Sequence, residues 1–164
     1  MKDLKNLSRA LTRKEMQTEV KNLKKAGEKI VFTNGCFDLL HVGHIELLTK
    51  AKNLGDVLIV AINSDKSLGC LKGQKRPLIG QKDRAKLLLS LKCVDYVIVF
   101  DEQTPKEILS ELLPDVLVKG SDYKSSEIVG KEYVKKIHRV PFVRGRSTTN
   151  LIKLIVNRYG YKKV

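Results

Sequence analysis

The chain has 164 residues, of which 42% are hydrophobic, so it is long enough for one domain with a buried core and too short for two. Its longest apolar run, residues 57–62, falls far short of the roughly 20 residues of a membrane-spanning helix, and residues 1–20 lack the apolar segment of a signal peptide. The formal charge of +14 favours an anionic partner such as phosphate or nucleic acid, although lysines spread along the chain also serve solubility.

The apolar pattern predicts helices and strands that alternate along the chain. In chain order it predicts a helix over 12–26, a strand over 29–33, a helix over 44–54, a strand over 56–62 and a loop over 63–80. A helix over 81–91, a strand over 96–100, a helix that begins at 104–105 and ends before 114, and a strand over 115–119 follow. The last elements are a helix around 127–136, a strand around 138–143 and a helix from 147 to about 158. We expect an N-terminal helical extension over 1–27, one domain over 28–158 and a basic tail over 159–164.

The predicted strands are continuous apolar runs, which is typical of a sheet covered on both faces. The sequence therefore predicts an α/β protein, a single Rossmann-like domain with a doubly wound parallel sheet of about five strands. Right-handed crossovers bring the carboxyl ends of such strands to one edge, where ligands bind. We expect residues 33–44, 63–65, 119–123 and 144–149 to meet there.

Those segments contain glycines, hydroxyls, cations, a helix start and two histidines, which are the components of a polyphosphate site. His41 and His44 are three residues apart, so they share a face of a first helical turn, and Gly43 leaves room for a close ligand. Imidazoles placed there can donate to phosphate oxygens during phosphoryl transfer. Two other interpretations stay open: a zinc pair, for which no third ligand is evident, and histidines that only cap the helix.

The stretch TNGCFDLLHVGH, residues 33–44, resembles the [ST]-x-G-x-F-D-x-x-H-x-G-H signature of the cytidylyltransferase-like nucleotidyltransferases. The stretch RGRSTTNLI, residues 144–152, resembles their second signature, and PDVLVKGSDY at 114–123, with LKG at 71–73 and RP at 76–77, is similar to the adenylyltransferases of ADP-heptose synthesis. The chain departs from that family at Ser121, where a second glycine is usual, and at Arg144, where an acidic residue is frequent. The resemblance implies direct transfer of AMP from magnesium-bound ATP to D-glycero-β-D-manno-heptose 1-phosphate, with release of pyrophosphate.

The resemblance also implies roles at the matching positions. The catalytic residues would be His41, His44 and Lys72, the last as a mobile cation over the phosphates unless it is only a solvated lysine. The nucleotide-binding residues would be Thr33, Asn34, Gly35, Cys36, Phe37, Gly43, Arg84, Lys119, Gly120, Asp122, Tyr123, Arg146, Ser147 and Thr148. Phe37 is expected to pack under its loop, and Arg84 has a salt bridge on its helix as its alternative role. Asp38 and Asp65 would border the acceptor, unless they order and cap their loops.

Cofactors, partners and location follow from the same interpretation. The nucleotide would carry Mg²⁺, and no protein ligand for the metal is expected. Cys36 need not be a nucleophile because direct transfer requires no thiol, and three widely spaced cysteines indicate a reducing, cytoplasmic setting. The resemblance implies a homodimer, and the apolar stripe of the N-terminal helix could pack on its own domain or on a neighbour. Two alternatives remain: nucleotidyl transfer to another acceptor, such as glycerol 3-phosphate with CTP or FMN with ATP, and a basic module that binds nucleic acid.

Overall fold

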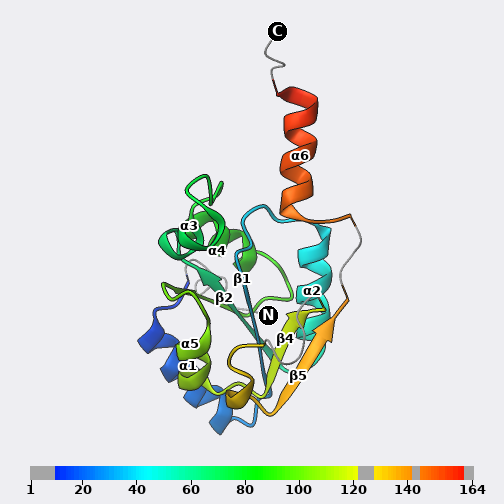
Figure 1. Cartoon of the computed structure of the whole chain (residues 1–164). Coiled ribbons are helices and arrows are strands. Elements are labelled where there is room, and N and C mark those ends of the chain that lie inside the picture. Colours follow the sequence, from blue (N-terminus) through cyan, green and yellow to red (C-terminus); the bar gives the residue numbers. More distant parts are fainter. Residues whose placement is uncertain (1–9, 122–127, 142–144, 161–164) are drawn as a thin grey trace.

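The computed structural model describes residues 10–121, 128–141 and 145–160, and it contains one parallel sheet of five strands in the order β3-β2-β1-β4-β5 (Figure 1). The strands are β1 (Ile30–Gly35), β2 (Val57–Asn63), β3 (Tyr96–Phe100), β4 (Val116–Gly120) and β5 (Lys136–Val140). This confirms the predicted doubly wound α/β class. The chain proceeds outward from β1 to β3 and then returns to the other side of β1, so the strand order reverses between β1 and β4.

Helices cover both faces of the sheet. On one face α2 (Val42–Lys52) and α4 (Gln81–Leu89) bury Leu48 and Leu88 against the strands. On the other face α1 (Arg13–Lys25) and α5 (Lys106–Leu112) bury Met16 and Leu109. Strand residues alternate between the two sides: Val31 joins the first cluster, and its neighbours in β1 join the second. This is why every residue of β2 is buried and why the strands read as unbroken apolar runs.

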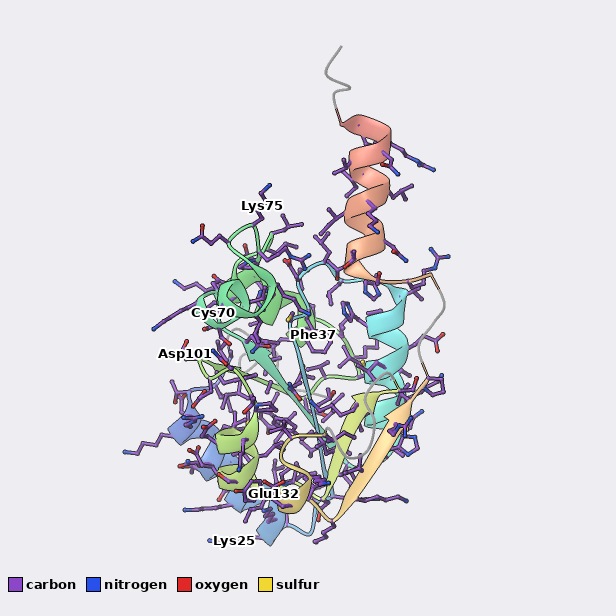
Figure 2. All side chains as sticks on the ribbon, in the orientation of Figure 1. Lys25, Phe37, Cys70, Lys75, Asp101 and Glu132 are labelled. Carbon is purple, nitrogen blue, oxygen red and sulfur yellow. The ribbon has the colours of Figure 1, made fainter. Side chains whose placement is uncertain are left out.

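Helix α1 packs on its own domain. Thr12 is its N-cap and forms a capping box with Glu15. Met16 and Val20 are 0% and 3% exposed within the core. The apolar stripe of the expected extension is therefore covered by this chain, while Lys25 lies at the surface (Figure 2).

The prediction of a loop over residues 63–80 is wrong, because helix α3 (Asp65–Lys72) lies within it. Ser64 is the N-cap and its Oγ accepts from the backbone N–H of Ser67 at 3.1 Å. Leu68 is fully buried, so cap and core contact outweigh the helix-breaking effect of Gly69. The remainder, residues 73–80, connects α3 to α4.

The prediction of a helix around 127–136 is also wrong for its described part. Residues 128–136 contain only a 3-10 turn, Lys131–Tyr133, because Gly130 has a positive φ of 83° and Lys136 already pairs with Val116 in the sheet. The following strand consequently begins two residues earlier than predicted. Its expected end falls partly on residues 142–144, which lie outside the described ranges.

Helix α6 (Thr148–Tyr159) projects from the domain above the carboxyl edge of the sheet (Figure 1). None of its residues is buried. Among the described residues, no helix is both long enough and apolar enough to cross a membrane.

Candidate active site

The two histidines of the β1–α2 connection stack face to face. His41 is the N-cap of α2 in an extended conformation, with φ −145° and ψ 167°, and its carbonyl accepts the backbone N–H of His44 at 2.9 Å. The ring centroids lie 3.8 Å apart with an interplanar angle of 19°. The predicted shared face is therefore confirmed. The capping interpretation is not, because the side chain of His41 makes no capping hydrogen bond.

Burial keeps this pair uncharged. It lowers the pKa of His41, and burial together with the charge of His41 lowers the pKa of His44 to about 4. The Nδ1 atoms of both rings are buried and have no hydrogen-bond partner among the described residues. Unpaired buried polar atoms are rare in proteins, so this histidine pair is an unusual feature of the site.

Phe37, Gly35 and Gly43 determine how closely the chain packs around the two imidazole rings. The Phe37 ring lies 5.0 Å from that of His44, and a Cβ on Gly35 would approach it to 3.0 Å. Phe37 is 3% exposed and lies in the molecular interior, so its predicted packing under the loop is confirmed (Figure 2). A Cβ on Gly43 would lie 3.1 Å from Nδ1 of His41, so the glycine leaves the ring free to occupy its position.

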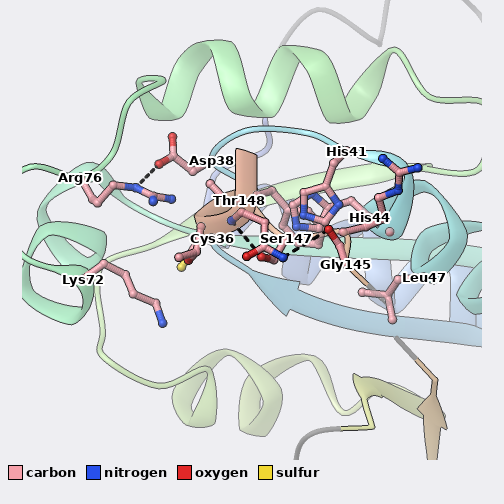
Figure 3. A pocket seen from close by; sticks show the side chains of 15 residues that line it. Cys36, Asp38, His41, His44, Leu47, Lys72, Arg76, Gly145, Ser147 and Thr148 are labelled. Atoms are coloured by element: carbon pink, nitrogen blue, oxygen red, sulfur yellow. Dashed lines mark hydrogen bonds and ion pairs between the residues drawn. The ribbon is translucent and has the colours of Figure 1, made fainter. Parts of the chain in front are cut away.

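The histidines line a cavity of about 580 Å³ at the carboxyl edge of the sheet (Figure 3). It unites the β1–α2 connection and the start of α6, which the sequence placed together, with the end of α3. Its lining comprises Cys36, Phe37, Asp38, His41, Gly43, His44, Leu47, Lys72, Arg76, Gly145, Arg146, Ser147, Thr148, Thr149 and Asn150. Ten of the predicted site residues are among these fifteen.

The start of α6 forms one wall of the cavity. Ser147 is the N-cap, and its Oγ accepts from the backbone N–H of Asn150 at 3.1 Å. The Thr148 hydroxyl donates to the carbonyl of Leu39 at 3.4 Å, which ties the helix start to the β1–α2 connection. Arg146 lies beside this start. A cation next to a helix N-terminus is an arrangement that favours an anion.

A second cavity of about 290 Å³ adjoins the first. Cys36 and Lys72 line both, so Lys72, the last residue of α3, lies between them. The predicted residues Asn34, Gly35 and Lys119 line this second cavity, where the Lys119 ammonium donates to the Asn34 side-chain oxygen.

The position of Arg84 contradicts the prediction that it binds the nucleotide. Its side chain is fully buried and donates to the carbonyls of Ile79, Cys36 and Asn63 at 2.6–2.9 Å and to the Asp65 carboxylate at 2.8 Å. It therefore supports the floor of the site and has no surface for a phosphate. The alternative of a salt bridge within its own helix is also wrong, because Asp65 belongs to α3.

Thr33 and Asp38 require similar corrections. Thr33 is 1% exposed, and its hydroxyl donates to the Val118 carbonyl at 3.0 Å, so it joins β1 to β4 instead of lining a phosphate site. The Asp38 carboxylate is 0% exposed and accepts from the backbone N–H groups of Leu78 and Ile79 and from Arg76. It orders the loop, as one interpretation held.

Two other predicted residues, Asp65 and Gly120, lie apart from the cavities. Asp65 begins α3 and is engaged with Arg84. Gly120 is buried at the end of β4. Neither is in the lining of the two cavities as far as the structure describes it. Asp122, Tyr123 and Arg144 lie outside the described residues.

Sequence reasoning missed Arg76, which lines the larger cavity and pairs with Asp38 (Figure 3). The signal available was the RP dipeptide after LKG, which contributed to the resemblance but was assigned no role. Cys36 also lines the cavity, and burial raises the pKa of its thiol, which disfavours a thiolate nucleophile. In the described part of the chain, no three His, Cys, Asp or Glu side chains gather as a metal site.

Comparison with known proteins identifies the family. The cytidylyltransferase-like family model matches residues 32–161. The chain belongs to the cytidylyltransferase-like family. It is a nucleotidyltransferase, 54% identical over 141 residues to the bifunctional protein HldE of Geobacter sulfurreducens and 56% identical over 128 residues to that of Helicobacter pylori. These matches cover 84% and 78% of this chain but 29% and 28% of the relatives, so the nucleotidyltransferase spans under a third of their length.

Solved structures agree with this assignment. The lipopolysaccharide core biosynthesis protein of Thermoplasma volcanium is 30% identical, with a TM-score of 0.61 over 71% of this nucleotidyltransferase and 99% of that chain. The pantoate-β-alanine ligase of Francisella tularensis is 22% identical, with a TM-score of 0.62 over 82% of this chain and 67% of that one. The second likeness shows the Rossmann-like fold alone.

Proposed function

We propose that this nucleotidyltransferase transfers AMP from ATP to D-glycero-β-D-manno-heptose 1-phosphate, forming ADP-heptose and pyrophosphate for lipopolysaccharide synthesis. The observation that carries the proposal is a single cavity in which two stacked, neutral imidazoles share the lining with the N-terminus of α6 and three cationic side chains. The heptose acceptor is supported by the HldE relatives and by the motif stretches that resemble ADP-heptose adenylyltransferases. The name of the Thermoplasma protein agrees with it.

The histidines are proposed to act as hydrogen-bond donors. An oxygen of the acceptor phosphate attacks the α-phosphorus, the bond between that phosphorus and the bridging oxygen to the β-phosphate breaks, and pyrophosphate leaves. A proton on the buried Nδ1 atoms of His41 and His44 would be an unpaired donor, so the neutral rings carry it on Nε2. Each Nε2–H then donates to an α-phosphoryl oxygen, whose changing charge it stabilises.

The other lining groups are proposed to bind the remaining phosphates. The free backbone N–H groups at the start of α6, with Ser147, Thr148 and Arg146, would bind the β- and γ-phosphates. Lys72, between the two cavities, would neutralise charge on the phosphates. Gly120, Asp122 and Tyr123 are retained as the proposed border of the ribose and base.

The lining fits an anion and not a metal held by the protein. Among the described residues of the lining, the one carboxylate, Asp38, is bonded to Arg76 and to backbone N–H groups, and the other charged groups are cations. Mg²⁺ would accordingly arrive with the nucleotide and lower the negative charge of its phosphates.

A second candidate is the same transfer with a different pair, such as CTP with glycerol 3-phosphate or ATP with FMN. The description of the family as cytidylyltransferase-like supports this second candidate. Nucleic-acid binding through the +14 charge is the third alternative, and it predicts an affinity that falls steeply with salt.

The decisive test is pyrophosphate release with a matrix of substrates. ATP, CTP and GTP with magnesium are each combined with heptose 1-phosphate, glycerol 3-phosphate, FMN or no acceptor. Release with ATP and heptose 1-phosphate alone supports the proposal. Release with another pair keeps the chemistry and replaces the substrates, whereas a folded protein that is silent throughout contradicts the transfer itself.

We also propose a cytoplasmic homodimer. ATP supply and three free cysteines fit the reducing compartment, and fractionation of cells would test this. The dimer is supported by the family resemblance and by α6, where Leu151, Ile152, Ile155, Val156 and Tyr159 form one apolar stripe at helical spacing. The last three of these side chains are 52–78% exposed.

A further inference from the structure

Arg76, in the connection between α3 and α4, and Arg84, in α4, differ in what their guanidinium groups contact. Arg84 is fully buried and uses Nε, Nη1 and Nη2 in hydrogen bonds to protein oxygens. Arg76 is 18% exposed, and only its Nε–H has a partner among the described residues. The four N–H bonds of its two terminal nitrogens are therefore available to a ligand.

Asp38 fixes the orientation of Arg76. The carboxylate is fully buried, and both of its oxygens accept from the backbone N–H of Leu78 at 2.9 and 3.1 Å, while Oδ1 also accepts from Ile79 at 2.9 Å. These bonds hold the carboxylate in place, and its Oδ2 accepts from Nε of Arg76. A buried, hydrogen-bonded carboxylate restricts a long side chain that would otherwise sample many rotamers.

The free end of Arg76 lies in the active site. The residue lines the same cavity as His41, Ser147 and Lys72. In Figure 3 the Arg76 guanidinium lies beside the Asp38 carboxylate, on the same side of the view as Lys72. A planar guanidinium with paired terminal donors matches two oxygens of a phosphoryl group, which a lysine ammonium cannot do in the same way.

We propose that Arg76 is a phosphate-binding residue of this active site and that Asp38 is its positioning residue. The terminal N–H groups of Arg76 donate to phosphoryl oxygens of a bound substrate, the nucleotide or the sugar phosphate. The names of those substrates rest on the proposed function, but phosphate as the ligand rests on the geometry of the pair.

The test compares Arg76→Gln, Arg76→Lys and Lys82→Ala with the unaltered protein. Lys82→Ala removes the same charge from an exposed position of α4 outside the cavity, so it is the matched control. Calorimetry gives Kd for ATP, pyrophosphate and inorganic phosphate, and kinetics gives KM for each substrate. Thermal melting reports folding.

Arg76→Gln is expected to raise one of these constants about 10- to 100-fold, the range for a lost hydrogen bond to a charged group. A change in Kd or KM for ATP assigns Arg76 to the nucleotide, and a change in KM for the acceptor assigns it to the sugar phosphate. Arg76→Lys is expected to recover part of the loss. Lys82→Ala is expected to change neither constant.

Asp38→Asn tests the positioning role. It keeps an oxygen for the two backbone N–H groups but removes the charge that faces Arg76. We expect it to raise the same constant as Arg76→Gln and to add nothing in the double variant, because Asp38 acts through Arg76. Additive effects would contradict that role.

The proposal is overturned if Arg76→Gln only lowers the thermal midpoint, or if every Kd and KM stays unchanged. If the unaltered protein turns over no substrate pair, that result contradicts the proposed function but not the proposed role of Arg76. The affinities for ATP, pyrophosphate and inorganic phosphate then still decide the role of Arg76, and unchanged values overturn it.

Discussion

His44 lies between Phe37 and His41, and burial there explains both its low pKa and its proposed role. A neutral imidazole has one N–H, and the surroundings decide where that N–H points. The Nδ1 atoms of both rings are buried and have no partner in the part of the chain that the structure describes, so the accessible edge faces the cavity. This arrangement is predisposed to donate to an oxyanion and requires little rearrangement when charge develops.

Replacing His44 with alanine should lower turnover by roughly 10² or more, the usual scale for a lost electrostatic donor. The affinity for nucleotide should change much less, because the donor acts mainly in the transition state. Steady-state kinetics and equilibrium binding of ATP separate the two effects. A parallel loss of folding and binding would instead indicate a structural histidine.

The low pKa of His44 also predicts a pH dependence of stability. The pKa is about 4 in the folded protein and 6.5 as the ordinary value, so between these pH values the unfolded chain binds the proton and the folded one does not. The free energy of unfolding should therefore fall as pH is lowered from 6.5 to 4. Thermal melts of the unaltered protein and His44→Asn should show a smaller fall in the variant, and equal falls would contradict the assignment.

Gly43→Ala should separate helix stability from activity. Alanine in place of a helical glycine normally stabilises by up to about 1 kcal/mol. Here the methyl group would meet the His41 ring at 3.1 Å and the Arg146 carbonyl at 3.4 Å. We expect an unchanged or higher thermal midpoint with turnover lowered roughly tenfold, since small displacements of catalytic groups are costly. Unchanged turnover would show that the ring does not need its present position.

At the scale of elements, α6 has an unusual position. It contributes the phosphate-binding start of a helix, yet none of its own residues is buried. Its start is held by the Ser147 cap and by the Thr148 contact to Leu39. The order of this wall of the site therefore depends on local hydrogen bonds more than on packing.

Ser147→Ala should consequently loosen α6 without unfolding the domain. Loss of an N-cap costs about 1 kcal/mol of helix stability. Amide hydrogen exchange should accelerate in α6 alone, and the Kd for ATP should rise. Ser147→Thr, which keeps a capping hydroxyl, should restore most of the protection. Exchange that accelerates equally in the sheet would show that α6 is not an independent element.

At the scale of the whole molecule, the exposed stripe of α6 bears on the proposed homodimer. Ile155→Glu places a charge in the centre of the stripe, whereas Asn157→Glu adds the same charge on the polar side of the helix. Sedimentation should show that only Ile155→Glu shifts the protein to monomer. A dimer that survives Ile155→Glu would exclude this surface, and a monomeric unaltered protein would contradict the dimer.

Much of the molecule could be derived from the sequence alone. The apolar runs of β1 and β2 identified a sheet covered on both faces, and two motifs located the stacked histidines and the start of α6. These features depend on local periodicity, on caps and on short spacings, which the order of residues expresses directly. Helix α3 was missed because a serine cap and one buried leucine outweighed the glycines around them.

Only the tertiary structure decided which polar side chains serve the ligand and which serve the protein. Arg84 and Thr33 are residue types that often bind ligands, but in the fold their donors point toward the carbonyls of Cys36 and Val118. Arg76 has the same chemistry as Arg84 and faces the cavity. The difference arises from burial and from partners distant in sequence, because a donor that leaves water must find an acceptor within the fold.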